Sequence, residues 1–165
     1  MKTLLFLRHG KSDWDADYET DHERPLTKRG IKASRKIGRF VNAIDEVPEI
    51  VISSTAERAI RTASLANEAG RWERNIRSTR KLYEASPVDL LGVIRTLDAG
   101  FQTVMLVGHE PTWSSTIGML TGANVRFPTT ALARIDIDRD DWESISLNGG
   151  QLIWLVVPKS LPDDR

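Results

Sequence analysis

The sequence contains no cysteine, and this absence excludes several kinds of chemistry. It rules out disulfide bonds, thiolate metal sites and a cysteine nucleophile, including the one on which cysteine-dependent phosphatases rely. An excess of charge of either sign is also missing, because 23 Lys and Arg residues balance 23 Asp and Glu residues. A chain with zero formal net charge has no global field that favours nucleic acid or a membrane surface. Any anion must therefore be recognised by a local group of side chains.

Long hydrophobic runs are absent as well. No segment approaches the ~20 apolar residues that are needed to span a bilayer. Residues 1–7 briefly resemble the start of a secretory signal, but the apolar stretch stops at Arg8 and no small-residue cleavage site follows. We therefore expect a cytoplasmic protein that binds neither a membrane nor nucleic acid.

The remaining composition is that of an ordinary globular protein. The chain has 165 residues, of which 28% are charged and 40% are hydrophobic, and a chain of this length is typical of one domain with one core. We expect a single domain over residues 1–158 and a frayed polar tail over residues 159–165. The sequence predicts no oligomeric state.

Strand-like apolar runs recur along the chain, and the first four alternate with helical patterns. The predicted strands are residues 3–7, 49–53, 77–82, 103–107, 132–137 and 152–157, with a further short one around residues 142–147. Alternation of strands and helices is typical of a parallel sheet, whereas the consecutive last strands favour antiparallel pairing at one side. The pattern predicts an α/β fold, a three-layer sandwich with a largely parallel mixed β-sheet flanked by helices.

Local signals mark where the predicted helices begin and end. Thr27 is a plausible N-cap, and Ser54 with Glu57 has the spacing of a capping box. Pro87 and Pro111 open two further helices, since proline is well tolerated in the first turn. Gly122 ends the last of these helices.

Functional-looking residues follow three of the predicted strands. The first strand runs directly into Arg8 and His9, the second into a helix whose first turn contains Arg58, and the fourth into a loop that contains His109. In an open α/β sheet, ligands bind beyond the carboxyl ends of the strands. If these strands are parallel, the four side chains meet in a single pocket.

The chemistry of these four side chains is coherent. Two guanidinium groups match phosphate oxygens in a bidentate fashion, and a neutral imidazole is a competent nucleophile. Each residue alone has a simpler interpretation: a histidine after a strand is often a cap or a core residue, and Arg58 is a surface charge much like Arg61. Only their convergence at one sheet edge favours a phosphate site.

Four motifs in order also resemble the histidine phosphatase superfamily. They are Leu7-Arg8-His9-Gly10, the Leu-Thr-x-x-Gly pattern within residues 24–30, the Ser-x-x-x-Arg-Ala-x-x-Thr pattern within residues 53–63, and Val107-Gly108-His109-Glu110-Pro111. The resemblance implies the phosphoglycerate mutase-like fold, with His9 as the phosphorylated nucleophile and Arg8, Arg58 and His109 as phosphate ligands. It implies a hydrolase that needs no metal and no cofactor.

Within the superfamily, the short length and residues 127–133 followed by Trp142 are similar to the SixA-type phosphohistidine phosphatase branch. The implied substrate is a phosphorylated protein histidine or a small phosphoester. Glu84 stands where many branches keep a proton donor, which would favour phosphoesters, although a surface carboxylate at a helix entry is an equal alternative. Mutase-like members usually have an asparagine five or six residues after the histidine, where this chain has Trp14 and Asp15. An acid at this position would oppose a bisphosphate substrate.

Two other functions are compatible with these motifs, and the acidic segment after the first motif has a further alternative. A catalytically weak module that only binds phosphorylated ligands would have the same fold, and so would a small-molecule phosphomonoesterase specific for sugar or aryl phosphates. The acidic segment 13–23 could suggest a calcium loop, but Tyr18 stands where such a loop needs glycine and Arg24 where it needs glutamate. We expect this segment to form a solvated rim beside the site.

Overall fold

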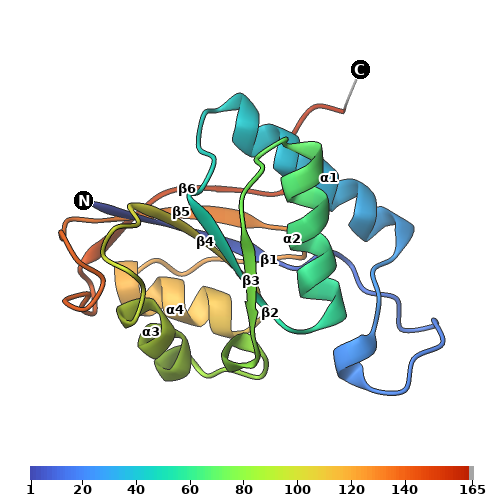
Figure 1. The fold of residues 1–165 in the computed structure, drawn as a ribbon, viewed down its shortest axis with the longest axis horizontal. Helices are drawn as coiled ribbons and strands as arrows, with labels where there is room; N and C mark the ends of the chain where they lie inside the picture. Colours follow the sequence, from blue (N-terminus) through green and yellow to red (C-terminus); the bar gives the residue numbers. More distant parts are fainter. Residues whose placement is uncertain (164–165) are drawn as a thin grey trace.

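The structure, a computed structural model that describes residues 1–163, is built on one mixed sheet with the strand order β3-β2-β4-β1-β5-β6 (Figure 1). The four strands β3, β2, β4 and β1 are parallel, whereas β5 and β6 run antiparallel at one side. The strands are β1 (Lys2–Arg8), β2 (Ile50–Ser54), β3 (Ile76–Thr79), β4 (Thr103–Gly108), β5 (Leu132–Ile137) and β6 (Gly150–Val156).

Helices cover both faces of the sheet, so the predicted three-layer α/β sandwich is confirmed (Figure 1). The pair α1 and α2 packs on one face, and the pair α3 and α4 packs on the other. The helices are α1 (Lys28–Ala43), α2 (Glu57–Ala69), α3 (Pro87–Arg95) and α4 (Thr112–Thr121), with short 3-10 helices η1 (Asp21–Glu23), η2 (Arg80–Leu82) and η3 (Pro158–Ser160).

The central strand β1 illustrates how the sequence produces these layers. Its side chains alternate between the two faces of the sheet, as in any strand. Leu4 and Phe6 pack in the cluster beneath α3 and α4, whereas Leu5 and Leu7 pack in the cluster beneath α1 and α2, and all four are fully buried. An uninterrupted apolar run is what a strand covered on both faces requires.

Most of the predicted helix signals are confirmed. The Thr27 hydroxyl accepts a hydrogen bond from the Gly30 amide at 3.0 Å, at the start of α1. Pro87 is the first residue of α3, and Gly122 ends α4 in the left-handed conformation (φ 79°) that glycine adopts without steric cost.

Three local predictions are wrong. The strand predicted over residues 77–82 ends at Thr79, whose hydroxyl accepts a hydrogen bond from the Lys81 amide at 3.3 Å, and residues 80–82 form η2. Residues 142–147 form turns rather than a strand: Trp142 and Ile145 are both buried, and a spacing of three does not fit strand alternation. The carboxylate of Asp141 instead accepts a hydrogen bond from the Ser144 amide at 2.7 Å, as in a turn. Ser54 is the last residue of β2 and not a helix cap, since α2 begins only at Glu57.

The end of the chain follows the face of the sheet that α1 covers. After β6, the chain forms η3, and Leu161 packs against the core cluster beneath α1 and α2. Asp163 pairs with Lys36 of α1 at 3.1 Å. The last two residues of the predicted tail, 164–165, lie outside the described part of the chain. No helix of residues 1–163 combines the length and the apolar character that crossing a membrane requires.

Two glycines inside helices test this packing. A Cβ on Gly38 would lie 2.1 Å from the Ala66 carbonyl oxygen where α1 crosses α2, whereas a Cβ on Gly92 in α3 would meet nothing within 4 Å. We expect Gly38→Ala to lower the free energy of unfolding by about 1–3 kcal/mol through overpacking. Gly92→Ala, the matched control, should raise it by about 0.5–1 kcal/mol. Urea unfolding of both variants measures this difference, and equal effects would contradict the close helix contact.

Candidate active site

The sheet brings together the strand ends that carry the predicted site residues. In the parallel pair of β1 and β4, Arg8 lies opposite Gly108, and in the pair of β2 and β4, Ser53 lies opposite Val107. The backbone amide of His9 donates to the Gly108 carbonyl at 3.0 Å, which extends this pairing by one residue. The carboxyl ends of the three strands therefore share one edge.

A cavity of about 310 Å³ opens at this edge, and all five predicted site residues line it. They are Arg8, His9, Arg58, Glu84 and His109. The remaining lining comes from the loops after β1, β4 and η2 and from the segment before β5, and consists of Lys11, Ser12, Trp14, Asp21, Arg24, Tyr83, Glu110 and Thr129. The lining has four cations, Arg8, Lys11, Arg24 and Arg58, against three acids, and its guanidinium groups can bind an anion.

The hydrogen bond that His9 makes fixes the tautomer of its neutral ring. The ring is 7% exposed, and its Nδ1 lies 2.7 Å from the Gly10 carbonyl oxygen. A carbonyl only accepts hydrogen bonds, so Nδ1 carries the proton of the neutral ring and Nε2 carries the lone pair. Burial lowers the pKa of His9 to about 3, against the opposing hydrogen bond to Gly10 and aided by the charges around it. The ring is therefore neutral at pH 7.

His109 stands beside His9, with 5.2 Å between the ring centroids. Its Nε2 lies 2.8 Å from the Ser54 hydroxyl oxygen at the end of β2. Burial and then the charge of Arg58 lower the pKa of His109 to about 4. The hydroxyl that the sequence suggested as a helix cap thus orients an active-site imidazole.

Arg58 is buried and Arg8 is half-buried, and each has a hydrogen-bond donor that is not used. Arg8 donates from Nη1 to the Phe127 carbonyl at 3.0 Å, and burial lowers its pKa against the opposing charge of Glu110. The Nε atoms of Arg8 and Arg58 are both buried and have no hydrogen-bond partner among residues 1–163. A buried N–H without a partner destabilises the folded state, so these donors are suited to an acceptor that binds in the cavity.

Asp21, which the sequence did not single out, connects the cationic side chains. Its carboxylate accepts from Arg58 Nη2 at 3.1 Å and from the Tyr83 hydroxyl at 2.9 Å, and it also pairs with Arg24. Burial opposes the ionisation of Asp21, but these hydrogen bonds and the charge of Arg58 prevail and lower its pKa to about 2. A carboxylate of the protein itself therefore binds the guanidinium groups.

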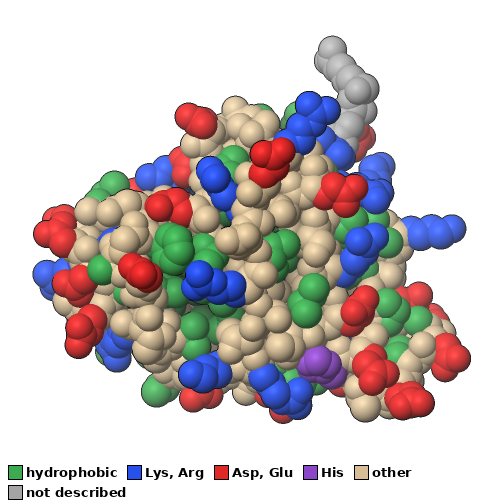
Figure 2. Space-filling model, in the orientation of Figure 1, with side chains coloured by type: hydrophobic (Ala, Val, Ile, Leu, Met, Phe, Trp, Pro, Cys, Tyr) green, Lys and Arg blue, Asp and Glu red, His purple; other side chains and the backbone are tan. Residues whose placement is uncertain are grey.

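The rim beside the cavity is acidic, as expected of residues 13–23. Figure 2 shows carboxylates gathered over the loop that follows β1, at the lower right. Trp14 belongs to this rim, is 65% exposed, and stacks 3.6 Å from the Arg24 guanidinium. Asp21 of the predicted solvated rim is half exposed, yet it pairs with Arg58 of the cavity, a residue distant in the chain.

Glu84 lies at the mouth of the cavity, and it is exposed. Its backbone adopts the left-handed region (φ 56°), which is uncommon for residues other than glycine. No hydrogen bond within residues 1–163 holds its carboxylate, so the side chain is free to turn toward a bound group.

Close backbone contact fixes the loop that follows His9. A Cβ on Gly10 would lie 2.9 Å from the Gly30 carbonyl oxygen, and a Cβ on Gly30 would lie 2.4 Å from the Lys11 carbonyl oxygen. The Thr27 amide also donates to the Lys11 carbonyl at 2.8 Å. The first turn of α1 therefore supports the backbone of the site. Among the described residues, no three His, Asp or Glu side chains are grouped so as to hold a metal ion.

The chain matches the model of a known protein family over a segment that contains all the predicted site residues except His109. The model of the histidine phosphatase superfamily (branch 1) matches residues 4–99. A chloroplastic protein of Arabidopsis thaliana that has not been characterised is 29% identical over 172 residues, which cover 96% of this chain and 79% of that protein.

Solved structures share the whole fold. The candidate phosphohistidine phosphatase SixA from Agrobacterium tumefaciens has a TM-score of 0.81 and 27% identity, covering 95% of this chain and 98% of its own. The protein histidine phosphatase SixA in complex with tungstate has a TM-score of 0.80 and 23% identity, covering 97% and 99% of the two chains.

The lowered pKa values predict how stability depends on pH. An unfolded chain protonates its histidines near pH 6.5, whereas the folded chain keeps His9 and His109 neutral down to about 3 and about 4. The folded state thus binds fewer protons than the unfolded state in this range. The free energy of unfolding is therefore highest above pH ~6.5 and falls as the pH falls. Urea unfolding between about pH 7 and about pH 5 should show the loss.

The control for this experiment is His9→Gln, which removes one of the two buried imidazoles. Its free energy of unfolding should fall by about half as much over the same pH range. An equal fall in both proteins would show that His9 takes up its proton as easily in the folded chain as in the unfolded one.

Proposed function

The chain belongs to the histidine phosphatase superfamily, and we propose that it is a phosphatase that forms a covalent phosphohistidine on His9 without a metal ion. The observation that carries this proposal is the state of His9. Its Nδ1 donates to the Gly10 carbonyl, and burial keeps the ring neutral, so the lone pair of Nε2 is available in a cavity that Arg8 and Arg58 also line. A neutral imidazole with one fixed tautomer is the form that attacks phosphorus.

The cations around His9 suit the charge of a transferring phosphoryl group. Arg8 and Arg58 offer guanidinium donors, including the two buried Nε atoms, to oxygens that lie on the phosphorus. His109 can donate a further hydrogen bond, and a bound dianion would favour its protonated form. Phosphoryl transfer depends mainly on such positioning and charge stabilisation.

The reaction has two steps. In the first, Nε2 of His9 forms a bond to phosphorus as the bond from phosphorus to the leaving group breaks. In the second, a water oxygen bonds to phosphorus as the Nε2–phosphorus bond breaks, which releases inorganic phosphate and the free imidazole. A proton must reach an alkoxide leaving group in the first step and leave the water in the second, and Glu84 at the mouth can perform both transfers.

The substrate class follows from the leaving group and the access to the site. An imidazole that leaves from phosphohistidine needs little protonation, whereas an alcohol needs an acid. A phosphorylated protein histidine is therefore one candidate substrate. A small phosphoester is the second candidate, and the position of Glu84 at the cavity favours it. A module that only binds phosphorylated ligands is the alternative, and trapping the phosphoenzyme distinguishes it.

Acetyl phosphate tests the covalent step. Rapid mixing with labelled acetyl phosphate should give an acid-labile phosphoenzyme in the wild-type protein, because His9 becomes a phosphoramidate. His9→Ala should abolish both the label and the turnover. His22→Ala is the matched control, since His22 does not line the cavity and its Nε2 bonds Thr55 at 2.7 Å. A wild-type protein that binds phosphate but never becomes labelled would instead be a binding module.

Glu84→Gln tests the leaving group. On phenyl phosphate, an ester with a poor leaving group, phosphoenzyme formation should slow by about tenfold or more, because proton transfer typically contributes ~10²–10⁴-fold. Phosphoenzyme formation from a phosphohistidine peptide should change little, whereas hydrolysis of the phosphoenzyme, which Glu84 also assists, should slow equally after both substrates. Glu57→Gln is the control, because Glu57 is an exposed glutamate outside the cavity lining. Equal slowing of phosphoenzyme formation from both substrates would show that Glu84 is not the leaving-group acid.

A further inference from the structure

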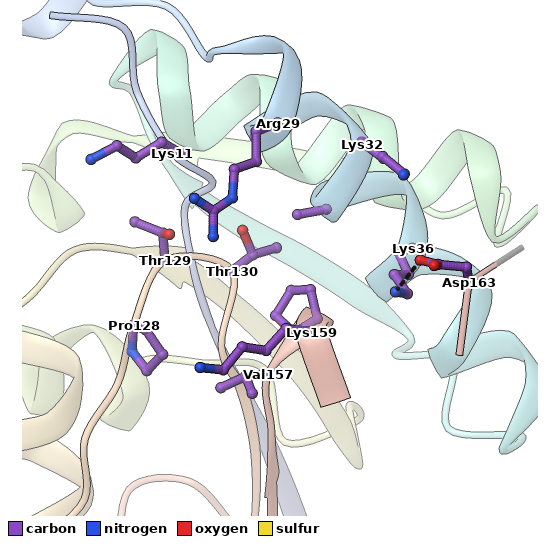
Figure 3. Close-up of a pocket in the computed structure, with 13 residues that line it drawn as sticks. Lys11, Arg29, Lys32, Lys36, Pro128, Thr129, Thr130, Val157, Lys159 and Asp163 are labelled. Carbon is purple, nitrogen blue, oxygen red and sulfur yellow. Dashed lines mark hydrogen bonds and ion pairs between the residues drawn. The ribbon is translucent and has the colours of Figure 1, made fainter. Parts of the chain in front are cut away.

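A second cavity of about 310 Å³ lies beside the active site, between α1 and the segments that precede β5 and follow β6 (Figure 3). One wall is the first half of α1, and the other is formed by residues 128–130 and 157–159. Apolar side chains, among them Ala33, Pro128 and Val157, line part of these walls. We call this cavity the basic cleft, for the cations described next.

Positive charge dominates the basic cleft. Its lining contains a single acid, Asp163, against five cations, which are Lys11, Arg29, Lys32, Lys36 and Lys159. Asp163 pairs with Lys36 at 3.1 Å, and none of the other four cations has an ion-pair partner within residues 1–163. Figure 3 shows that Arg29 and Lys159 extend from opposite walls. The cleft therefore concentrates positive charge in a chain whose net charge is zero.

The stability of α1 does not account for these cations. The first turn of α1 contains Lys28 and Arg29 and no acidic residue. The N-terminus of a helix carries the positive end of its dipole, so cations there weaken the helix and acids strengthen it. Both the dipole and the Arg29 side chain, which lines the cleft, thus add to the positive potential of the cleft.

The basic cleft is continuous with the active site. Lys11 and Thr129 line both cavities. Thr130 joins them through the backbone, because its amide donates to the His9 carbonyl at 3.0 Å. It is buried and left-handed (φ 61°), which is a strained conformation for a β-branched residue. In Figure 3, the hydroxyls of Thr129 and Thr130 face the cleft. The hydrogen bond from Thr130 to His9 thus fixes the cleft wall to the backbone of the proposed nucleophile.

The structure already shows a carboxylate in the cleft. The Lys36 ammonium, by its hydrogen bond and its charge, and then the charge of Lys32 lower the pKa of Asp163, which stays ionised. Asp163 lies at the end of the cleft near Lys36, whereas Lys11, Arg29 and Lys159 lie away from that end (Figure 3), and Lys11 also lines the active-site cavity. An acidic side chain of another polypeptide would have these three cations as its partners.

We infer that the basic cleft binds an acidic segment next to the phosphorylated residue of a protein substrate, so that the active site takes the phosphoryl group and the cleft takes neighbouring carboxylates. This inference rests on the proposed phosphatase function and specifies its substrate class. Nucleic acid fits less well, since no aromatic side chain lines the cleft to stack on a base.

The test compares two peptides that each carry one phosphohistidine. One has two Asp residues on the same side of the histidine, and the other has Asn at the same positions. At low ionic strength, the wild-type protein should show a KM for the acidic peptide about fivefold lower than for the neutral one, which is the effect of two partly exposed ion pairs. Arg29→Gln combined with Lys159→Gln should remove this preference, and added salt should weaken it.

A matched double variant controls for net charge. Lys28→Gln with Arg35→Gln also removes two positive charges from α1, at exposed positions outside the cleft, and should keep the preference. Turnover of p-nitrophenyl phosphate should be unchanged in both double variants, because that substrate carries no flanking carboxylate.

The possible failures are distinguishable. If the wild type hydrolyses p-nitrophenyl phosphate but does not prefer the acidic peptide, the inference about the cleft is wrong and the phosphatase remains. The same conclusion follows if both double variants lose the preference equally. If no substrate is hydrolysed, the proposed function fails, and fluorescence anisotropy of the labelled acidic peptide still decides whether Arg29 and Lys159 bind it. Tighter binding of a single-stranded oligonucleotide to these residues would overturn the assignment to a protein.

Discussion

Parallel pairing of β1 with β4, and of β4 with β2, places the carboxyl ends of three buried strands at one edge of the sheet. Every side chain with a proposed chemical role depends on this register. A shift of β1 by one residue would turn His9 to the opposite face and place a charged side chain in an apolar cluster. The strands are held in register because both faces of β1 are apolar and each face is covered by helices. The packing that stabilises the fold therefore also sets the distance between the two imidazoles.

Burial in this register affects the imidazoles and the guanidinium groups of the site differently. It keeps His9 and His109 neutral, because a positive ring loses solvation without gaining a counter-charge close enough to compensate. It leaves the arginines charged, since guanidinium remains protonated at any ordinary pH. Asp21 then supplies the negative charge that buried cations need, and Arg58 together with Tyr83 keeps it ionised. A phosphoryl group that binds between Arg8 and Arg58 would meet Asp21 as a competitor for the donors of Arg58.

The sequence predicted the layers and the meeting of four site residues because both follow from local patterns. Alternation of strands with helices specifies parallel pairing, and the residues after each strand then lie at one edge. The role of Asp21 could not be predicted, because its partners Arg58 and Tyr83 are distant in the chain and its own neighbours are solvated acids. Ser54 shows a related error: its spacing from Glu57 fits a capping box, but His109, brought close by the sheet, binds the same hydroxyl. Tertiary contacts thus overrode the local signal at the site itself.

The net charge of zero arises although two regions of opposite charge lie beside the site. Acids of residues 13–23 lie along one part of the rim, and the basic cleft meets the active-site cavity at Lys11 and Thr129. At physiological ionic strength, charges act over only about 8 Å, so the net charge of zero conceals a strong gradient across the mouth. A substrate whose negative charges lie on one side of its phosphoryl group has one favourable orientation in this gradient. Reversing it would bring those charges against the acidic rim, so the same field that attracts an acidic segment also rejects its wrong orientation.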